Sequence, residues 1–423
     1  MLKHQKKVSI MKVSLQIDIE IPKNINFCRL VLEVAKISKE LLAAVLMALQ
    51  GQLVKEMCGD RYSRESKYLL AGTKERTFKT SLGKIKVKLQ KIRKREEKIR
   101  FSPLEVLLKI EKRKRNTNDL LLASVRQALE QSYRKSIAST KDMLTIAASK
   151  SSLWRFVQAT EMSISKPKES IDIVFADDTV AKSQDGKEIL FRHVIGLNLK
   201  KMQYFLLKVA VNDSWENIAK SVSEFVDISK AYLISDADRG IINAFKDFVK
   251  DNQICVLHVI KYVTYSLWSQ DAPKNYKKKV KRKIQQLLFT LVNSSKKNAG
   301  TERLNDRLGK TRKGLLDLAE DLRKKKFIMA ADFITTHIDE ITTFARAAKE
   351  MANIPYTNNR EEREMREFGY RAKRIGARWS VKGLQSLSLK KFIKRFDREN
   401  FINFEKSFIG DGEIKFSIHP LGV

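Results

Sequence analysis

The stretch Ile171-Asp172-Ile173-Val174-Phe175-Ala176-Asp177 decides the fold class of this chain. It is a short apolar run that ends in a carboxylate, and Tyr232-Leu233-Ile234-Ser235-Asp236 repeats the pattern later in the sequence. Runs of this kind are typical of strands that are buried inside a sheet. We therefore expect an α/β domain, and the segments around these runs indicate what kind of sheet it contains.

Three more strand-like runs and two helical stretches accompany these strands. Residues 189–199, 204–211 and 254–257 are predicted strands. Ser214 is predicted to cap a helix that places Trp215 in the core, and a second helix is expected over 239–250. The resulting order β-β-β-α-β-α-β predicts a mixed sheet of five strands, in which three antiparallel strands are followed by parallel ones.

The sequence before this sheet has the pattern of an α+β DNA-binding region. Residues 1–115 contain a predicted helix at 27–57 and a predicted β-hairpin at 76–93, and its alternation puts Lys84, Lys86 and Lys88 on one face. Residues 116–165 resemble a helix-turn-helix unit, with a second helix over 140–147, Ser149 as a cap and Arg155 on the last helix. A plain helical bundle explains residues 116–165 equally well.

The sequence after this sheet is predicted to be mainly helical. Residues 170–258 form the first part of the predicted core, and the Lys-rich residues 259–350 indicate an all-α insertion without strands. A helix from about Asn358 to Arg374, within 351–390, completes the core. Residues 391–423 have a mixed pattern and are interpreted as a tail.

The charge of the chain indicates a polyanionic partner. Its 423 residues include 84 Lys and Arg against 49 Asp and Glu, which gives a formal net charge of +35. Nucleic acid is the expected partner, because lysines and arginines that neutralise phosphates release counterions. A Lys-rich composition without a functional meaning is the alternative. The apolar content of 43% excludes a disordered basic tail, because it is enough to build packed cores.

Composition also bears on the cellular compartment. Three cysteines cannot form a disulfide framework, so a reducing cytosol is expected. The longest clean apolar run, Leu41 to Leu49, is far shorter than the roughly 20 residues that span a bilayer. The Lys-rich start of the chain is not followed by an apolar stretch, so we expect neither a signal peptide nor a membrane partner.

Three carboxylates stand out by their context. Asp177 and Asp236 end neighbouring strands, and the carboxyl ends of strands in α/β sheets commonly form ligand sites. Glu362 lies in the first turn of the predicted helix at Asn358. Carboxylate oxygens are preferred by Mg²⁺ and Mn²⁺, and a pair of such ions would relieve the repulsion between three acids. A single acid is more often a cap or a surface charge, so the prediction depends on all three meeting.

Four short motifs follow one another in order along the second half of the chain. They are Phe175-Ala176-Asp177-Asp178-Thr179, Ile234-Ser235-Asp236-Ala237-Asp238-Arg239-Gly240, Cys255-Val256-Leu257-His258, and Thr357-Asn358-Asn359-Arg360-Glu361-Glu362-Arg363, followed by Arg378-Trp379-Ser380. Together they resemble the motifs of the DDE transposases of prokaryotic insertion sequences, in the Mutator-like group, and the resemblance covers roughly residues 170–390. Glu362, rather than Glu361 or Glu364, corresponds to the glutamate of that family, and Asp178 stands where the family has glycine.

The resemblance implies a fold, a reaction and partners. It implies a ribonuclease H-like core with a helical insertion, in which Asp177, Asp236 and Glu362 hold two Mg²⁺ (or Mn²⁺) ions. The implied reaction is hydrolysis at the element's ends, followed by attack of the 3′-OH on target DNA. The implied partners are double-stranded DNA, as terminal inverted repeats and target, and a second copy of the chain in a dimer or larger assembly at the nucleoid. A non-catalytic DNA-binding derivative and a structure-specific nuclease are the alternatives.

Several further residues are candidates for accessory roles. Asp178 is a second candidate beside the first aspartate, whereas one Cys255–His258 pair is poor support for zinc, which needs four ligands in a structural site. His258 is expected either to contact DNA or to be structural. Basic residues at +1, +4 and +11 from Glu362 are candidates for holding DNA, although a solvated face is an equally good interpretation; they are Arg363, Arg366 and Lys373.

Overall fold

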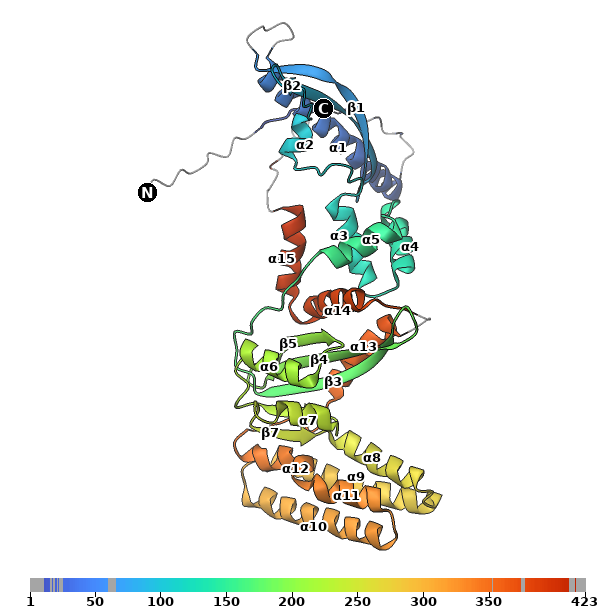
Figure 1. The fold of residues 1–423 in the computed structure, drawn as a ribbon, viewed down its shortest axis with the longest axis vertical. Coiled ribbons are helices and arrows are strands. Elements are labelled where there is room, and N and C mark those ends of the chain that lie inside the picture. The colour runs from blue at the N-terminus through green and yellow to red at the C-terminus, as the bar shows by residue number, and fades with distance from the viewer. Residues whose placement is uncertain are drawn as a thin grey trace, which may run out of the picture. The chain divides into compact units, whose positions relative to one another are not determined.

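The structure, a computed structural model, describes residues 11–15, 17, 20, 22, 26–59, 66–351, 353–373, 377–410 and 415. The chain forms two compact units. One consists of Met1–Val157 with Glu405–Val423, and the other of Gln158–Phe404 (Figure 1). This division is coarser than the segments predicted from sequence, whose boundaries stay predictions.

A long helix on a β-hairpin forms the first part of the N-terminal unit (Figure 1). Helix α1 (Phe27–Cys58) begins where the side chain of Asn26 accepts a hydrogen bond from the backbone N–H of Arg29. Strands β1 (Tyr68–Thr80) and β2 (Gly83–Lys94) pair antiparallel, and Gly83 takes the positive φ of +124° that their turn requires. The predicted helix and hairpin are thus confirmed.

The hairpin has one buried and one exposed face. Ile85, Val87 and Leu89 of β2 are buried, and leucines of α1, such as Leu46 and Leu49, pack against them. The lysines between them point outward and are exposed, which confirms the predicted alternation; they are Lys84, Lys86 and Lys88.

Helix α1 also bears on the membrane prediction. Within the described residues, Lys36–Cys58 is long and apolar enough by composition to cross a membrane, although the clean apolar run inside it is shorter. One such helix is weak evidence for a span. In this structure one face of the helix packs on the hairpin, so part of its apolar surface already has a partner within the chain.

Four further helices complete the N-terminal part of the chain, and their bounds differ in part from the prediction. The helix predicted over 140–147 starts at residue 133 instead, because Ser132 caps it by accepting a hydrogen bond from the N–H of Lys135. It ends before Thr145, which has a φ of +60°. Ser149 accepts the N–H of Ser152, as predicted. The helices are α2 (Pro103–Leu107), α3 (Asn118–Ala128), α4 (Tyr133–Leu144) and α5 (Lys150–Ala159).

A mixed five-stranded sheet forms the centre of the second unit, which confirms the predicted α/β class. Its order is β5-β4-β3-β6-β7, with the first three strands antiparallel and the last two parallel to β3. Strand β4 pairs with β3 without a register shift, from Leu197 opposite Ile173 to Glu188 opposite Lys182. The strands are β3 (Ile173–Lys182), β4 (Glu188–Asn198), β5 (Gln203–Val211), β6 (Tyr232–Ser235) and β7 (Asp251–Ile254).

Two boundaries at the parallel edge of the sheet were predicted wrongly. The last strand spans Asp251–Ile254 and not 254–257, because the chain turns at Cys255 and helix α8 (Val256–Ser269) starts directly after it. The preceding helix α7 (Arg239–Phe245) is shorter than the predicted 239–250, since β7 already begins at Asp251.

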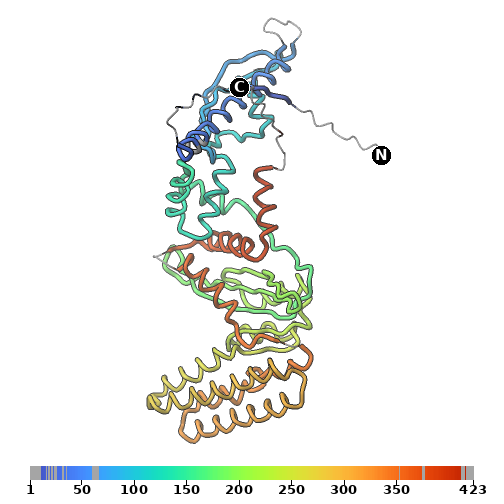
Figure 2. Tube along the Cα trace, turned by 180° about the vertical axis from the view of Figure 1, so that it is seen from behind, coloured from blue at the N-terminus to red at the C-terminus, as the bar shows by residue number. Residues whose placement is uncertain are grey.

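Each face of this sheet packs against its own helices. Val174 and Ala176 of β3 belong to the core beneath α6 (Trp215–Phe225) and α7, where Trp215 is buried as predicted. The opposite face is covered by α13 (Asn359–Ala372) and α14 (Val381–Phe396), and Figure 2 shows α13 against the sheet from behind. Alternate residues of β3 therefore point toward different environments.

Between β7 and α13 the chain is helical. Residues 259–350 are all described and contain no strand, as predicted. The segment interpreted as a tail is also helical, from α14 into α15 (Arg398–Ile409), whereas residues 411–414 and 416–423 lie outside the described part. Helix α13 ends at Ala372, and Arg374, where the predicted helix ends, lies outside the described residues. The helices before α13 are α8, α9 (Lys274–Lys297), α10 (Glu302–Lys324), α11 (Ile328–Thr336), α12 (Ile338–Arg346) and the 3₁₀ helix η1 (Ala347–Lys349).

Candidate active site

The two aspartates predicted from sequence meet at adjacent strands of the sheet. Strands β3 and β6 are parallel neighbours, and Phe175 pairs with Ile234. Asp177 and Asp236 each follow two residues after that pair, so they lie at the same level of the sheet. The charge of Asp236 contributes to raising the pKa of Asp177, which places the two carboxylates within electrostatic reach of each other.

Asp177 and its neighbour Asp178 point to opposite faces of the sheet. Asp177 pairs across the strands with His193 and faces α13. Asp178 faces α6 and α7, where its carboxylate lies 3.8 Å from Nε of Arg192 and feels the charge of Asp238. The alternation of the strand therefore separates the two aspartates, and Asp177, the one that the sequence favours, shares a face with His193.

The electrostatics of the aspartates suit a cation. Burial raises the pKa of Asp177 to about 8, and the neighbouring acids Glu361 and Asp236 add to the effect. Burial also raises the pKa of Asp236, although the N–H of Asp238 and the charge of His258 oppose the change. The environment of each aspartate therefore disfavours its negatively charged form. A bound divalent cation would stabilise that charged form and lower both pKa values. An all-oxygen donor set of this kind fits Mg²⁺ or Mn²⁺.

A buried histidine and glutamate lie directly beside Asp177. His193 of β4 and Glu361 of α13 are both fully buried, and Nδ1 of the imidazole is hydrogen-bonded to the Glu361 carboxyl group. Burial lowers the pKa of His193 to about 3 and raises the pKa of Glu361 well above its ordinary value. Both directions favour a neutral pair, in which the O–H of the carboxylic acid donates a hydrogen bond to Nδ1 of the imidazole.

This neutral pair was not predicted from sequence. The motif resemblance selects Glu362 and not Glu361, and His193 lies in an apolar strand without any motif around it. The hairpin register gave the available signal, because a strand residue opposite Asp177 shares its face. The second oxygen of Glu361 and Nε2 of His193 have no hydrogen-bond partner within the described part of the chain.

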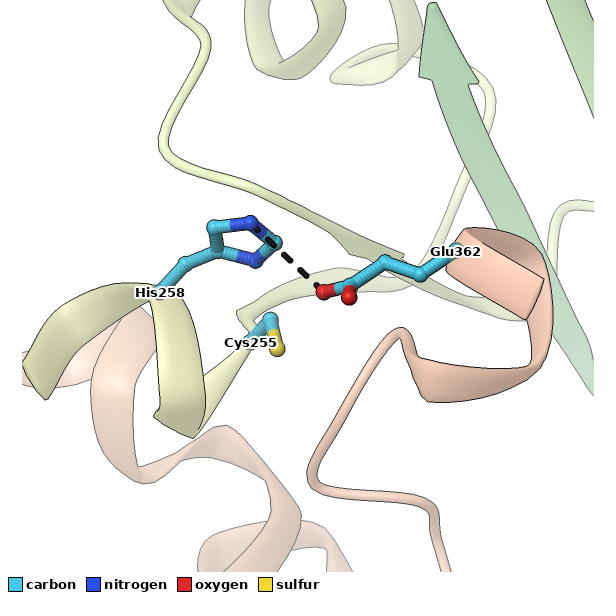
Figure 3. A group of neighbouring side chains, drawn as sticks. All are labelled: Cys255, His258 and Glu362. Carbon is cyan, nitrogen blue, oxygen red and sulfur yellow. Dashed lines mark ion pairs between the residues drawn. The ribbon is translucent and has the colours of Figure 1, made fainter. Parts of the chain in front are cut away.

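Glu362 belongs to a second cluster, with Cys255 and His258 (Figure 3). Nε2 of His258 lies 3.6 Å from a carboxylate oxygen of Glu362, and one donor atom from each of the three residues lies within 4.8 Å of the others. The backbone holds the cluster together, since the N–H of Val256 at the start of α8 donates to the carbonyl of Tyr356 just before α13. Burial raises the pKa of the Cys255 thiol, which disfavours the thiolate that zinc requires.

His258 connects the two parts of the site. Its charge acts on Asp236, and its ring faces Glu362. Asp236 thus interacts electrostatically with both Asp177 and His258, and His258 forms an ion pair with Glu362. The glutamate that acts electrostatically on Asp177 is Glu361 and not Glu362. Among the described residues, the close group of potential metal ligands is Cys255, His258 and Glu362, and it includes neither Asp177 nor Asp236.

The basic residues predicted to bind DNA are exposed in both units. Arg363 and Arg366 are exposed on α13, Lys373 is exposed at its C-cap, and Arg155 is exposed on α5. Trp379 is buried and its indole N–H donates to the carbonyl of Ala372, which confirms the expectation that it packs. Exposure leaves the basic side chains free to contact a polyanion, and their contact with DNA stays a prediction.

Replacing Asp177 with Asn should stabilise the metal-free protein at pH 8. The pKa of Asp177 is about 8 when folded and near 4 when unfolded, so the folded state holds the extra proton between these values. Its contribution to stability is therefore largest at low pH and is lost as the pH rises to about 8. We expect the variant to gain roughly 3–5 kcal/mol at pH 8 and little at pH 4, measured by urea unfolding in EDTA.

The matched control for this measurement is Asp247→Asn, which removes one carboxylate from an exposed position of the same unit. Added Mg²⁺ should stabilise the wild type and leave Asp177→Asn unchanged. Equal pH dependence in the wild type and Asp177→Asn would contradict the raised pKa.

The chain was also compared with known protein families. A family model with the description "Uncharacterised protein family (UPF0236)" matches residues 22–401. This range includes the hairpin, the whole sheet, the helices α8 to α14 and every acidic residue of the site. No curated protein matches the chain.

Proposed function

The chain belongs to the uncharacterised family UPF0236, and we propose that it is a metal-dependent DNA transposase. The observation that carries the proposal is that Asp177 and Asp236 lie at the same level of adjacent parallel strands, with Glu361 of α13 acting electrostatically on Asp177. Glu362, the next residue of α13, lies beside His258. The order of the sheet is compatible with a ribonuclease H-like core, which is part of the proposal, as is the role of α8 to α12 as its insertion. The resemblance of the four motifs supports the same assignment.

Asp177, Asp236 and Glu362 would hold two Mg²⁺ ions in this proposal. When bound, such ions activate the attacking oxygen and stabilise the leaving oxygen during in-line displacement at phosphorus. The protein's part is to keep the carboxylates at fixed positions on the sheet and on α13. His258 would orient the carboxylate of Glu362 and offer a cationic partner to Asp236.

Two successive displacements use this one site. Water attacks phosphorus at the element's end, a new P–O bond forms, and the bond to the 3′ oxygen breaks, so the element keeps a 3′-OH. That hydroxyl then attacks a phosphodiester of the target, and the target's own 3′ oxygen leaves. The number of P–O bonds is unchanged in the second step, so no nucleotide cofactor is required.

The positive charge of the chain would bring DNA to these acids. The exposed lysines of β2 and Arg155 of α5 would bind the terminal inverted repeats in duplex form, and Arg363 and Arg366 would neutralise phosphates beside Glu362. Because two ends must be cut together, we propose that a dimer or larger assembly forms on the DNA. The protein would act at the nucleoid.

The deciding experiment incubates purified protein with labelled element-end DNA and Mg²⁺ or Mn²⁺. Cleavage together with joining to target DNA is the result expected of a transposase. Cleavage without joining would favour a structure-specific nuclease, and binding without cleavage would favour a non-catalytic DNA-binding protein. Inverted repeats around the gene would supply the sequence of the DNA to be tested.

Duplex binding should weaken steeply as salt increases. Each lysine that neutralises a phosphate contributes about 0.9 to the slope of log K against log salt. Replacing Lys84, Lys86 and Lys88 together with Gln should therefore lower that slope by roughly 2 to 3, measured by fluorescence anisotropy. The control replaces three exposed lysines between β7 and α13 and should leave the slope nearly unchanged; they are Lys297 of α9, Lys313 of α10 and Lys326 in the turn after α10. An equal change in both variants would contradict a specific role of the hairpin.

A further inference from the structure

An open groove of about 600 Å³ runs between α8 and α9. Two aromatic side chains, Tyr265 and Trp268, line it from α8. Five lysines line it as well, Lys261 from α8 and four from the first turns of α9. The α9 lysines are Lys274, Lys277, Lys278 and Lys281.

The aromatic rings of the groove are unusually exposed. Tyr265 keeps 60% and Trp268 keeps 64% of its surface accessible. Their ring centroids lie 5.9 Å apart with an angle of 32° between the planes. Large aromatic side chains gain free energy when they are covered, and an exposed pair that leaves a groove open is typical of a binding surface.

The lysines of the groove keep their charge available. None of the five forms an ion pair within 4 Å in the part of the chain that the structure describes. Five cations along one groove repel one another, and a polyanion would relieve that repulsion. Aromatic faces beside cations match an unpaired nucleic-acid strand, whose bases stack while its phosphates are neutralised.

The groove begins at the acidic site. Leu257, which lines it, is the residue before His258, and Lys261, which also lines it, lies within electrostatic reach of Asp236. Leu257 and Trp268 are separated by eleven residues of α8, which is roughly 16 Å along a helix axis and corresponds to about five stacked nucleotides. A strand in the groove would therefore lead directly to the carboxylates.

We propose that the α8–α9 groove binds an unpaired DNA strand beside the site of cleavage, an inference that rests on DNA being the substrate of the proposed function. Duplex DNA keeps its bases paired and stacked inside the helix, so it can use the lysines but not the rings. The rings thus select single-stranded DNA, and the groove would hold the strand that separates from its complement at the cut.

Affinity for single strands tests the role of the rings. The full chain carries Asp236→Asn, so that the probe stays intact, and is titrated with labelled oligothymidylate and with a duplex of equal length. Adding Tyr265→Ala and Trp268→Ala should weaken single-strand binding about tenfold or more and leave duplex binding unchanged. Trp268→Phe should retain most of the affinity, since it keeps a ring. Met329→Ala, an exposed apolar position on α11, is the control for loss of surface.

A second pair of variants tests the role of the lysines. Lys278→Gln with Lys281→Gln should weaken single-strand binding, whereas Lys279→Gln with Lys283→Gln removes the same charge from the same helix outside the groove. Photo-crosslinking of a single strand containing 5-iodouracil should label Tyr265 or Trp268, as located by mass spectrometry. Equal loss in both lysine pairs, crosslinks only outside α8, or competition by polyglutamate as strong as by oligothymidylate would overturn the proposal.

The single-strand binding test and the test for cleavage and joining can fail independently of each other. Single-strand binding that depends on the rings, in a protein that never cleaves DNA, would support the groove and contradict the proposed reaction. Cleavage and joining that survive Tyr265→Ala with Trp268→Ala, at unchanged single-strand affinity, would support the reaction and overturn the groove.

Discussion

Replacing either Asp177 or Asp236 with Asn is expected to lower Mg²⁺-dependent cleavage of element-end DNA by about a thousandfold or more. The substitution keeps the shape of the side chain and removes the negative charge that would hold the cation. Both residues lie at the same level of adjacent parallel strands, so loss of either disrupts the same site. The measurement is the single-turnover cleavage rate at saturating protein, followed by gel electrophoresis of labelled DNA.

Asp178→Asn is the matched control for this prediction. Asp178 is the next residue of β3, but it faces α6 and α7 and lies near Arg192 on that side. We expect this variant to keep cleavage within about tenfold of the wild type, which is roughly 1.4 kcal/mol of activation free energy. If Asp178→Asn abolished cleavage while Asp177→Asn did not, the assignment of the first aspartate would be wrong. Unchanged circular dichroism would show that each variant is folded.

The sheet and its aspartates could be predicted because their signals are local. An apolar run that ends in a carboxylate identifies a buried strand and its carboxyl end within seven residues, as at Ile171 to Asp177. The order of the runs then gave the mixed sheet, since sequential strands are usually neighbours. The hairpin lysines were predictable for the same reason, because alternation assigns a face to each residue.

The parts that could not be predicted depend on contacts between distant residues. The apolar residues 254–257 are compatible with a strand and with the start of a helix. In the structure the strand ends at Ile254, the chain turns at Cys255, and the helix starts at Val256. His193 and Glu361 are 168 residues apart, and only packing of α13 on the sheet brings them together. The aromatic groove exists because α8 and α9 lie side by side, so exposure of Tyr265 and Trp268 has no signature in the sequence.

Two adjacent glutamates in the first turn of α13, Glu361 and Glu362, differ in their exposure. Glu362→Gln is expected to lower cleavage by about a thousandfold and to leave the free energy of unfolding nearly unchanged. Its carboxylate is partly exposed beside Cys255 and His258, so the amide can be solvated after the substitution. A cation between the strands and α13 needs an accessible oxygen with open positions for water and phosphate, which the buried Glu361 does not offer.

Glu361→Gln is the matched control, one residue earlier in the same helical turn. Burial keeps the carboxyl group of Glu361 protonated, and a glutamine amide reproduces its shape, its neutrality and its ability to donate to Nδ1 of His193. Cleavage should therefore fall far less in this variant than in Glu362→Gln. Measuring both cleavage and urea unfolding for the two variants separates a ligand from a packing residue. If Glu361→Gln abolished cleavage without destabilising the fold, Glu361 would be the third acid of the site, and the electrostatic contact with Asp177 would be its functional partner.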